Sequence, residues 1–74
     1  MDEAEILGDI DYQLREVIAH LSDKYGGAVT DRKLGQYLLT AQTHCAIHIA
    51  KKIGLPKAAI DELVTDAWVN NKIG

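Results

Sequence analysis

The chain is short, acidic overall and nearly free of cysteine, and these properties exclude several classes of protein. Seventy-four residues permit one domain, expected to span residues 1–74, whose core supplies only a few kcal/mol unless metals, disulfides or self-association add to it. Cys45 is the only cysteine, so no internal disulfide is available and a cytoplasmic location is expected. No signal peptide and no apolar run of about 18 residues is present, so export and membrane contact are not expected.

Charge is segregated along the chain, although the net charge is only −3. Residues 1–16 carry six acidic residues against Arg15, whereas residues 24–57 carry six basic residues against Asp31. Helix dipoles favour such a distribution, because acids stabilise helix N-termini and bases stabilise helix C-termini. The alternative is a basic patch in the middle of the chain that recruits an anionic partner.

Three helices are predicted, and the first covers residues 3–25. Its apolar residues recur at steps of three and four, as in the seam between two packed helices: Leu7, Ile10, Leu14, Val17 and Leu21. Gly26 and Gly27 are expected to end this helix, because glycine adopts the left-handed conformation at helix C-termini. The short connection that follows predicts an antiparallel hairpin with the next helix.

The second predicted helix covers residues 31–53, with Thr30 as its N-cap and Gly54 as its stop. Its apolar residues occupy about 220° of the helix circumference, more than one packed neighbour can cover. The third helix covers residues 56–70 and is expected to open with Pro56 at its first helical position. No strand-like alternation is present. The sequence therefore predicts an all-α fold, a small three-helix bundle built on the helical hairpin.

The wide apolar arc of the second helix predicts a homo-oligomer, a dimer or larger. One stripe at steps of three and four is expected at the centre of the interface: Gly35, Leu38, Gln42, Cys45 and Ile49. A glycine lets another helix approach closely, and a buried glutamine has to find hydrogen-bond partners. Across a two-fold axis, Gln42 would bond its symmetry mate and fix the register. The alternative is that Gln42 reaches solvent.

One cluster in the second helix has metal-ligand chemistry. His44 and His48 are four residues apart on one helix face, and Cys45 lies three before His48. In an antiparallel hairpin, Asp11 of the first helix faces this cluster. A hydrogen bond from one histidine to Asp11 is the expected outcome, and a metal site formed by Asp11, His44 and His48 is the alternative. No activated nucleophile, paired carboxylates or phosphate loop is visible, so neither catalysis nor a cofactor is expected.

Residues 46–64 carry small and apolar residues at the spacing of a tight helix pair: Ala50, Gly54, Leu55, Ile60 and Leu63. This stretch resembles a helix-turn-helix motif, which implies DNA binding. The motif's first helix is usually short, whereas the second predicted helix is long. Asp61 and Glu62 on the presumptive reading face would also repel phosphates.

A basic cluster surrounds the start of the third helix and is a candidate anion site, formed by Lys51, Lys52 and Lys57. In addition, Arg32 and the helix end at residues 49–51 are similar to positions in phage helical-hairpin proteins that sequester cyclic nucleotides. That resemblance implies a small anionic nucleotide bound between subunits, and it identifies no binding residue in this chain.

We therefore expect a non-enzymatic, all-α regulatory or interaction module that works as a homo-oligomer and binds another macromolecule, in the first place a protein. A helix-turn-helix DNA-binding protein is the main alternative. A protein that sequesters a nucleotide, or one that binds a metal, comes third.

Overall fold

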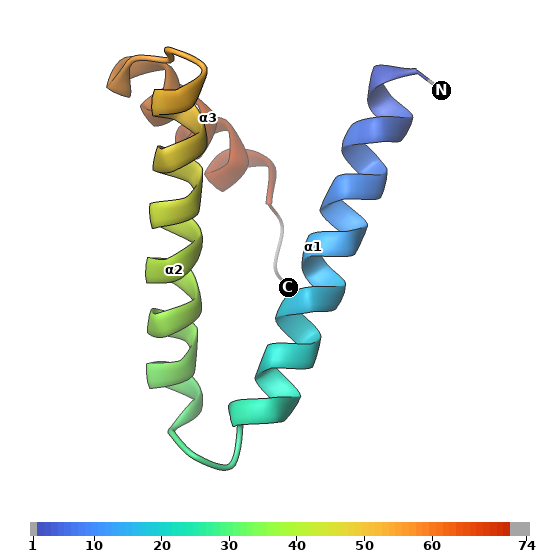
Figure 1. The fold of residues 1–74 in the computed structure, drawn as a ribbon, viewed down its shortest axis with the longest axis vertical. Coiled ribbons are helices and arrows are strands. Elements are labelled where there is room, and N and C mark those ends of the chain that lie inside the picture. The colour runs from blue at the N-terminus through green and yellow to red at the C-terminus, as the bar shows by residue number, and fades with distance from the viewer. Residues whose placement is uncertain (1, 72–74) are drawn as a thin grey trace. The chain divides into compact units, whose positions relative to one another are not determined.

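A computed structural model describes residues 2–71, which form three α-helices and no strand (Figure 1). Helix α1 spans Glu3–Tyr25, α2 spans Asp31–Lys52 and α3 spans Lys57–Asn70. The all-α prediction is confirmed, and each helix boundary falls within one residue of its predicted position. None of the three helices combines the length and apolar character that crossing a membrane requires. The packing of the three helices as a bundle stays a prediction.

The chain divides into two compact units, Met1–Leu39 and Thr40–Gly74, and the division falls within α2. Each unit contains one turn between helices with a small cluster of apolar side chains beside it. We call residues 18–38 the first corner and residues 47–63 the second corner. The expected single domain of residues 1–74 stays a prediction.

Helix α1 begins with a side-chain cap. Asp2 is extended, and its Oδ1 accepts a hydrogen bond of 2.8 Å from the backbone N–H of Glu5. Glu3 and Glu5 lie in the first turn and Lys24 in the last, so the charges at both ends interact favourably with the helix dipole. Three of the six acidic residues in 1–16 thus lie where helix capping and the dipole favour them, namely Asp2, Glu3 and Glu5.

The first corner turns without the left-handed glycine that we expected. Gly26 follows α1 with φ −61° and ψ −23°, in the right-handed region, so that expectation is wrong. Instead, the N–H of Ala28 donates to the carbonyl oxygen of Tyr25 at 3.0 Å, which closes a tight turn. The next helix is then started by Thr30, whose Oγ1 accepts from the N–H of Lys33 at 3.3 Å, as predicted.

Leu34 is the centre of the first corner. Its side chain is 8% exposed, and the other apolar residues of this corner with partly covered side chains are Ile18, Leu21, Val29 and Leu38. They come from the last turns of α1, the connecting turn and the first turns of α2. The hairpin is therefore held by aliphatic packing close to its turn.

The second corner is built on backbone geometry. Gly54 has φ +78°, and its N–H donates to the carbonyl oxygen of Lys51 at 3.3 Å, while the N–H of Leu55 donates to that of Ala50 at 2.9 Å. This pair of bonds is a Schellman motif, which satisfies carbonyl groups at the end of α2. Ala50 is 4% exposed, and Ile60 is partly buried.

Pro56 stands one position earlier than expected. It is the N-cap of α3, with φ −75° and ψ 162°, rather than its first helical residue. Its carbonyl oxygen accepts from the N–H groups of Ala59 at 3.0 Å and Ile60 at 3.4 Å. The extended ψ of Pro56 sets the direction in which α3 leaves the turn.

Candidate interaction surface

The predicted interface stripe lies on α2, and most of it is uncovered. Leu38 is partly buried in the first corner, while Gly35, Gln42, Cys45 and Ile49 are exposed, and Ile49 retains 59% of its accessible surface. Gln42 therefore meets neither a buried partner nor a polar network within the described part of the chain. The stripe is an apolar surface with one amide in its middle.

Helix periodicity separates this stripe from the covered sides of α2. At about 100° per residue, Leu34 lies about 80° to one side of Gln42 and Ala50 about 80° to the other. These are the only two apolar residues described as buried in residues 2–71. The residues that bury Leu34 in the first corner and Ala50 in the second leave most of the stripe between them exposed.

Among the described residues, nothing near Gly35 requires a glycine at this position. A Cβ atom built there would meet no other atom within 4 Å, and its backbone is that of an ordinary helix. Glycine in the middle of a helix costs roughly 0.5–1 kcal/mol relative to alanine. An approaching helix backbone is one reason for a protein to carry that cost.

The residues of the candidate metal site lie in different units. Asp11 is in Met1–Leu39, where its Oδ2 accepts from the Nε of Arg15 at 2.9 Å, whereas His44 and His48 are exposed residues of Thr40–Gly74. Within residues 2–71, no group of three or more His, Cys, Asp or Glu side chains is placed to hold a metal ion. The hydrogen bond from Asp11 to a histidine stays a prediction.

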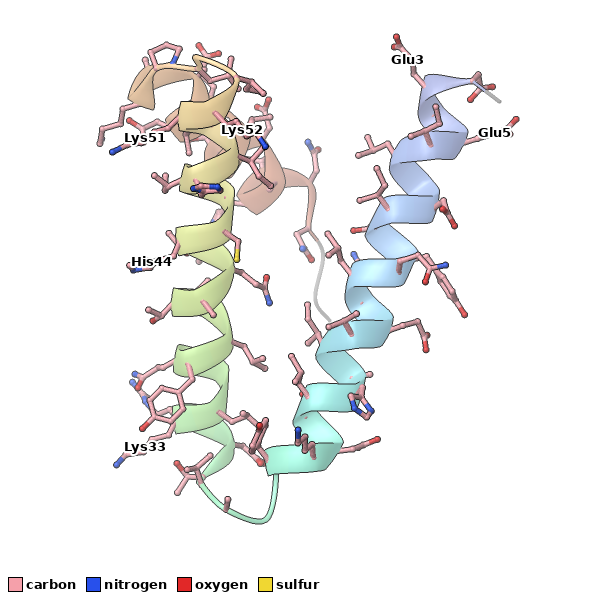
Figure 2. The ribbon with its side chains drawn as sticks, viewed as in Figure 1. Glu3, Glu5, Lys33, His44, Lys51 and Lys52 are labelled. Atoms are coloured by element: carbon pink, nitrogen blue, oxygen red, sulfur yellow. The ribbon has the colours of Figure 1, made fainter. Side chains whose placement is uncertain are left out.

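The three lysines of the candidate anion site differ in their surroundings. Lys51 and Lys52 are exposed at the end of α2, and Figure 2 shows their side chains pointing to different sides of the helix. Lys57 donates from Nζ to Oδ2 of Asp61 at 3.0 Å, so its charge already has a partner. The structure shows no convergence of Lys51 and Lys52 on one point.

The candidate site residues predicted from the sequence do not include Trp68 of α3, which lies on an exposed apolar patch. Trp68 is 84% exposed, and Val64, four residues earlier and on the same face, is exposed as well. A shallow surface depression on the same helix is lined by Asp61, Glu62, Thr65 and Asp66. We call Val64 and Trp68 the α3 patch. Its sequence signal is the pair of apolar residues Val64 and Trp68, spaced four residues apart.

Comparison with protein families, with curated proteins and with solved structures finds no match to this chain. The surfaces of α2 and α3 are therefore the basis on which a function is inferred.

Proposed function

We propose that this protein is a non-catalytic interaction module that associates with copies of itself through the stripe on α2 and binds a second protein. The observation that carries the proposal is the exposed stripe centred on Gln42, with Gly35 at a position where an added Cβ would meet open space among the described residues. A second helix on this stripe would use both features.

The small buried core supports self-association. Leu34 and Ala50 are the two apolar residues described as buried within residues 2–71. Burial of the stripe on α2 against a second copy would add apolar contacts to those of a small core.

The α3 patch supports a protein as the further partner. Tryptophan is enriched among the residues that contribute most to protein–protein binding, and Trp68 is presented almost fully to solvent. We therefore infer a protein partner with an apolar groove that accepts Trp68.

DNA binding is the second candidate, because the second corner has the tight turn of a helix-turn-helix: the Schellman motif at Gly54 and the buried Ala50. The charges point the other way. Residues 57–70 carry three acids and only Lys57, which pairs with Asp61. A mobility-shift titration over a salt series separates the two, since DNA binding through phosphates weakens steeply with salt.

The self-association claim is tested by a pair of glycine substitutions. Gly35→Leu fills the predicted helix crossing, and Gly8→Leu makes the same change on α1, where an added Cβ also meets no atom within 4 Å. Both variants gain helix propensity equally. We expect Gly35→Leu to weaken association at least tenfold, measured by sedimentation equilibrium, and Gly8→Leu to leave it unchanged.

A substitution of Gln42 should have the opposite effect on association from Gly35→Leu. Gln42→Leu removes the polar group and keeps the side-chain volume, so association should be retained or strengthened, with less restriction on register. Loss of association in Gln42→Leu, or no difference between Gly35→Leu and Gly8→Leu, would contradict the proposed interface.

The α3 patch is tested by affinity capture with Trp68→Ala. Tyr12→Ala is the matched control, since Tyr12 is an exposed aromatic residue of α1. We expect a protein retained by the wild type and by Tyr12→Ala to be lost with Trp68→Ala. Equal retention by all three chains would remove the α3 patch from the proposal.

A further inference from the structure

Two histidines of α2 share one face of the helix, on the side away from the stripe centred on Gln42. His44 and His48 are four residues apart, so they are neighbours on the helix surface, about 6 Å apart along its axis. At about 100° per residue, they lie about 160° and 120° around the helix from Gln42. Both belong to the unit Thr40–Gly74, so a single continuous helix sets their relative placement.

Both imidazoles are available to a ligand. His44 and His48 are exposed, and Figure 2 shows the His44 side chain pointing outward from α2 on the same side as Lys51. Neither imidazole has a hydrogen bond or an ion pair with another described residue. No protein group therefore has to be displaced before these nitrogens bind a ligand.

Two imidazoles one helical turn apart can chelate a transition-metal ion. Imidazole nitrogen is a suitable ligand for Cu²⁺, Ni²⁺ and Zn²⁺, and zinc proteases use two histidines at this spacing on a helix. Once one imidazole holds the ion, the other is at high effective concentration. The pair should therefore bind more tightly than a single exposed histidine such as His20.

The surroundings of the pair select the class of ion. Residues 32–52 contain no Asp or Glu, whereas Mg²⁺ and Ca²⁺ require oxygen ligands such as carboxylates. In the described part of the chain, no third His, Cys, Asp or Glu side chain is placed to complete a metal site with the pair. Water then fills the other coordination positions. The site therefore favours an ion that binds nitrogen ligands and keeps part of its hydration shell.

Cys45 is the competing ligand, because it is exposed and lies three residues before His48. Around the helix, about 60° separate Cys45 from His48, against about 40° between His44 and His48. A thiol must also lose its proton to bind a metal, whereas a neutral imidazole binds directly. Both the geometry and the protonation favour the histidine pair.

We propose that His44 and His48 form a binding site for a divalent transition-metal ion, with Cu²⁺ bound more tightly than Ni²⁺ or Zn²⁺. Two imidazole nitrogens replace two water molecules of the hydrated ion. The site lies on the side of α2 away from the stripe, so this inference does not depend on the proposed self-association.

Ni²⁺ titration followed by calorimetry tests the pair, with variants that separate the ligands. Thr43→His/His44→Thr keeps three histidines but places two of them about 140° apart on α2, so the affinity for Ni²⁺ should fall at least tenfold. His20→Ala and Cys45→Ser should each bind Ni²⁺ within about twofold of the wild type. Circular dichroism of each variant verifies that its helices are intact.

Several results would overturn the proposal. One is the absence of Ni²⁺ binding by the wild type, and another is an equal loss of affinity in His20→Ala. Loss in Cys45→Ser with binding kept in Thr43→His/His44→Thr would instead assign the site to Cys45 and His48. Competition by about a hundredfold excess of Mg²⁺ would contradict a site made of imidazoles.

Electron paramagnetic resonance identifies the ligands directly. Cu²⁺ is added to Cys45→Ser, in which the thiol cannot bind or reduce the ion. We expect a spectrum with two coordinated imidazole nitrogens, reduced to one when His44→Ala is added to this variant. A single coordinated nitrogen in Cys45→Ser itself would overturn the proposed pair.

Discussion

The two corners of the molecule both turn the chain from one helix into the next, but they are stabilised differently. The first corner has a right-handed Gly26 and is held by aliphatic packing around Leu34. The second has a left-handed Gly54 and two backbone hydrogen bonds, and its buried residue is the small Ala50. One corner therefore depends on a side chain, and the other on a backbone conformation.

This difference indicates where the chain is sensitive to substitution. Truncating an aliphatic side chain such as Leu34 should destabilise the first corner. Adding a methyl group at Gly54 should destabilise the second. Outside the corners, much of the apolar surface of α1 and α2 is exposed, and substitutions there should act on association more than on folding. Four predictions test this division, from the largest expected effect to the smallest.

Leu34→Ala should have the largest effect on folding stability. Truncating a buried leucine costs 2–5 kcal/mol in well-packed cores, and about 2 kcal/mol is expected in this small cluster. Chemical denaturation at fixed protein concentration measures the change. Leu39→Ala is the control, because Leu39 is 67% exposed on the same helix. Equal losses in the two variants would contradict the packing role of Leu34.

Gly54→Ala should break the second corner through the backbone. An L residue at φ +78° costs about 1–2 kcal/mol, although an added Cβ has open space around it. Gly27→Ala is the control, since Gly27 has no positive φ and the same open space, so its free energy of unfolding should be unchanged or slightly raised. A neutral Gly54→Ala would show that the turn does not depend on its left-handed residue.

Thr30→Ala should weaken the start of α2 by about 1 kcal/mol or less, because the hydrogen bond from the Lys33 N–H to Oγ1 is long at 3.3 Å. Thr30→Ser keeps the hydroxyl group and should restore most of the loss. Hydrogen exchange of the first turn of α2 locates the effect. If hydrogen exchange rises in α3 instead, the result would contradict the role of Thr30 at the start of α2.

Arg15→Ala should change stability least. The ion pair with Asp11 joins two exposed side chains of α1 outside both corners, and exposed pairs four residues apart contribute about 0.3–0.5 kcal/mol. The change in the free energy of unfolding should stay below about 0.5 kcal/mol and shrink in high salt. A loss comparable to that of Leu34→Ala would show that Asp11 and Arg15 have a further structural role.

The helices could be predicted from the sequence because their ends are marked by local chemistry. Thr30 caps α2, and Gly54 ends it, and both effects involve residues within one turn. The conformation of Gly26 could not be predicted in the same way, because glycine adopts both right-handed and left-handed backbone conformations. Pro56 is the N-cap of α3 and not its first helical residue. The sequence could not distinguish the two positions, because the fixed φ of proline suits both.

The candidate site could be predicted only as a pattern. The spacing of Gly35, Gln42 and Ile49 places them on one stripe, and the structure shows Gln42 and Ile49 exposed on α2. What covers a stripe depends on other helices, so no local signal in the sequence identifies the partner. The exposure of Trp68 likewise depends on which face of α3 lies against the second corner, and helix periodicity alone does not reveal it.

Sedimentation equilibrium of the wild-type protein tests the central claim of self-association through α2 most directly. The account predicts a dimer or larger species at about 100 μM that dissociates on dilution, because association depends on concentration by mass action. A clean monomer at that concentration would contradict the account, since the stripe on α2 would then have to be covered within the chain itself.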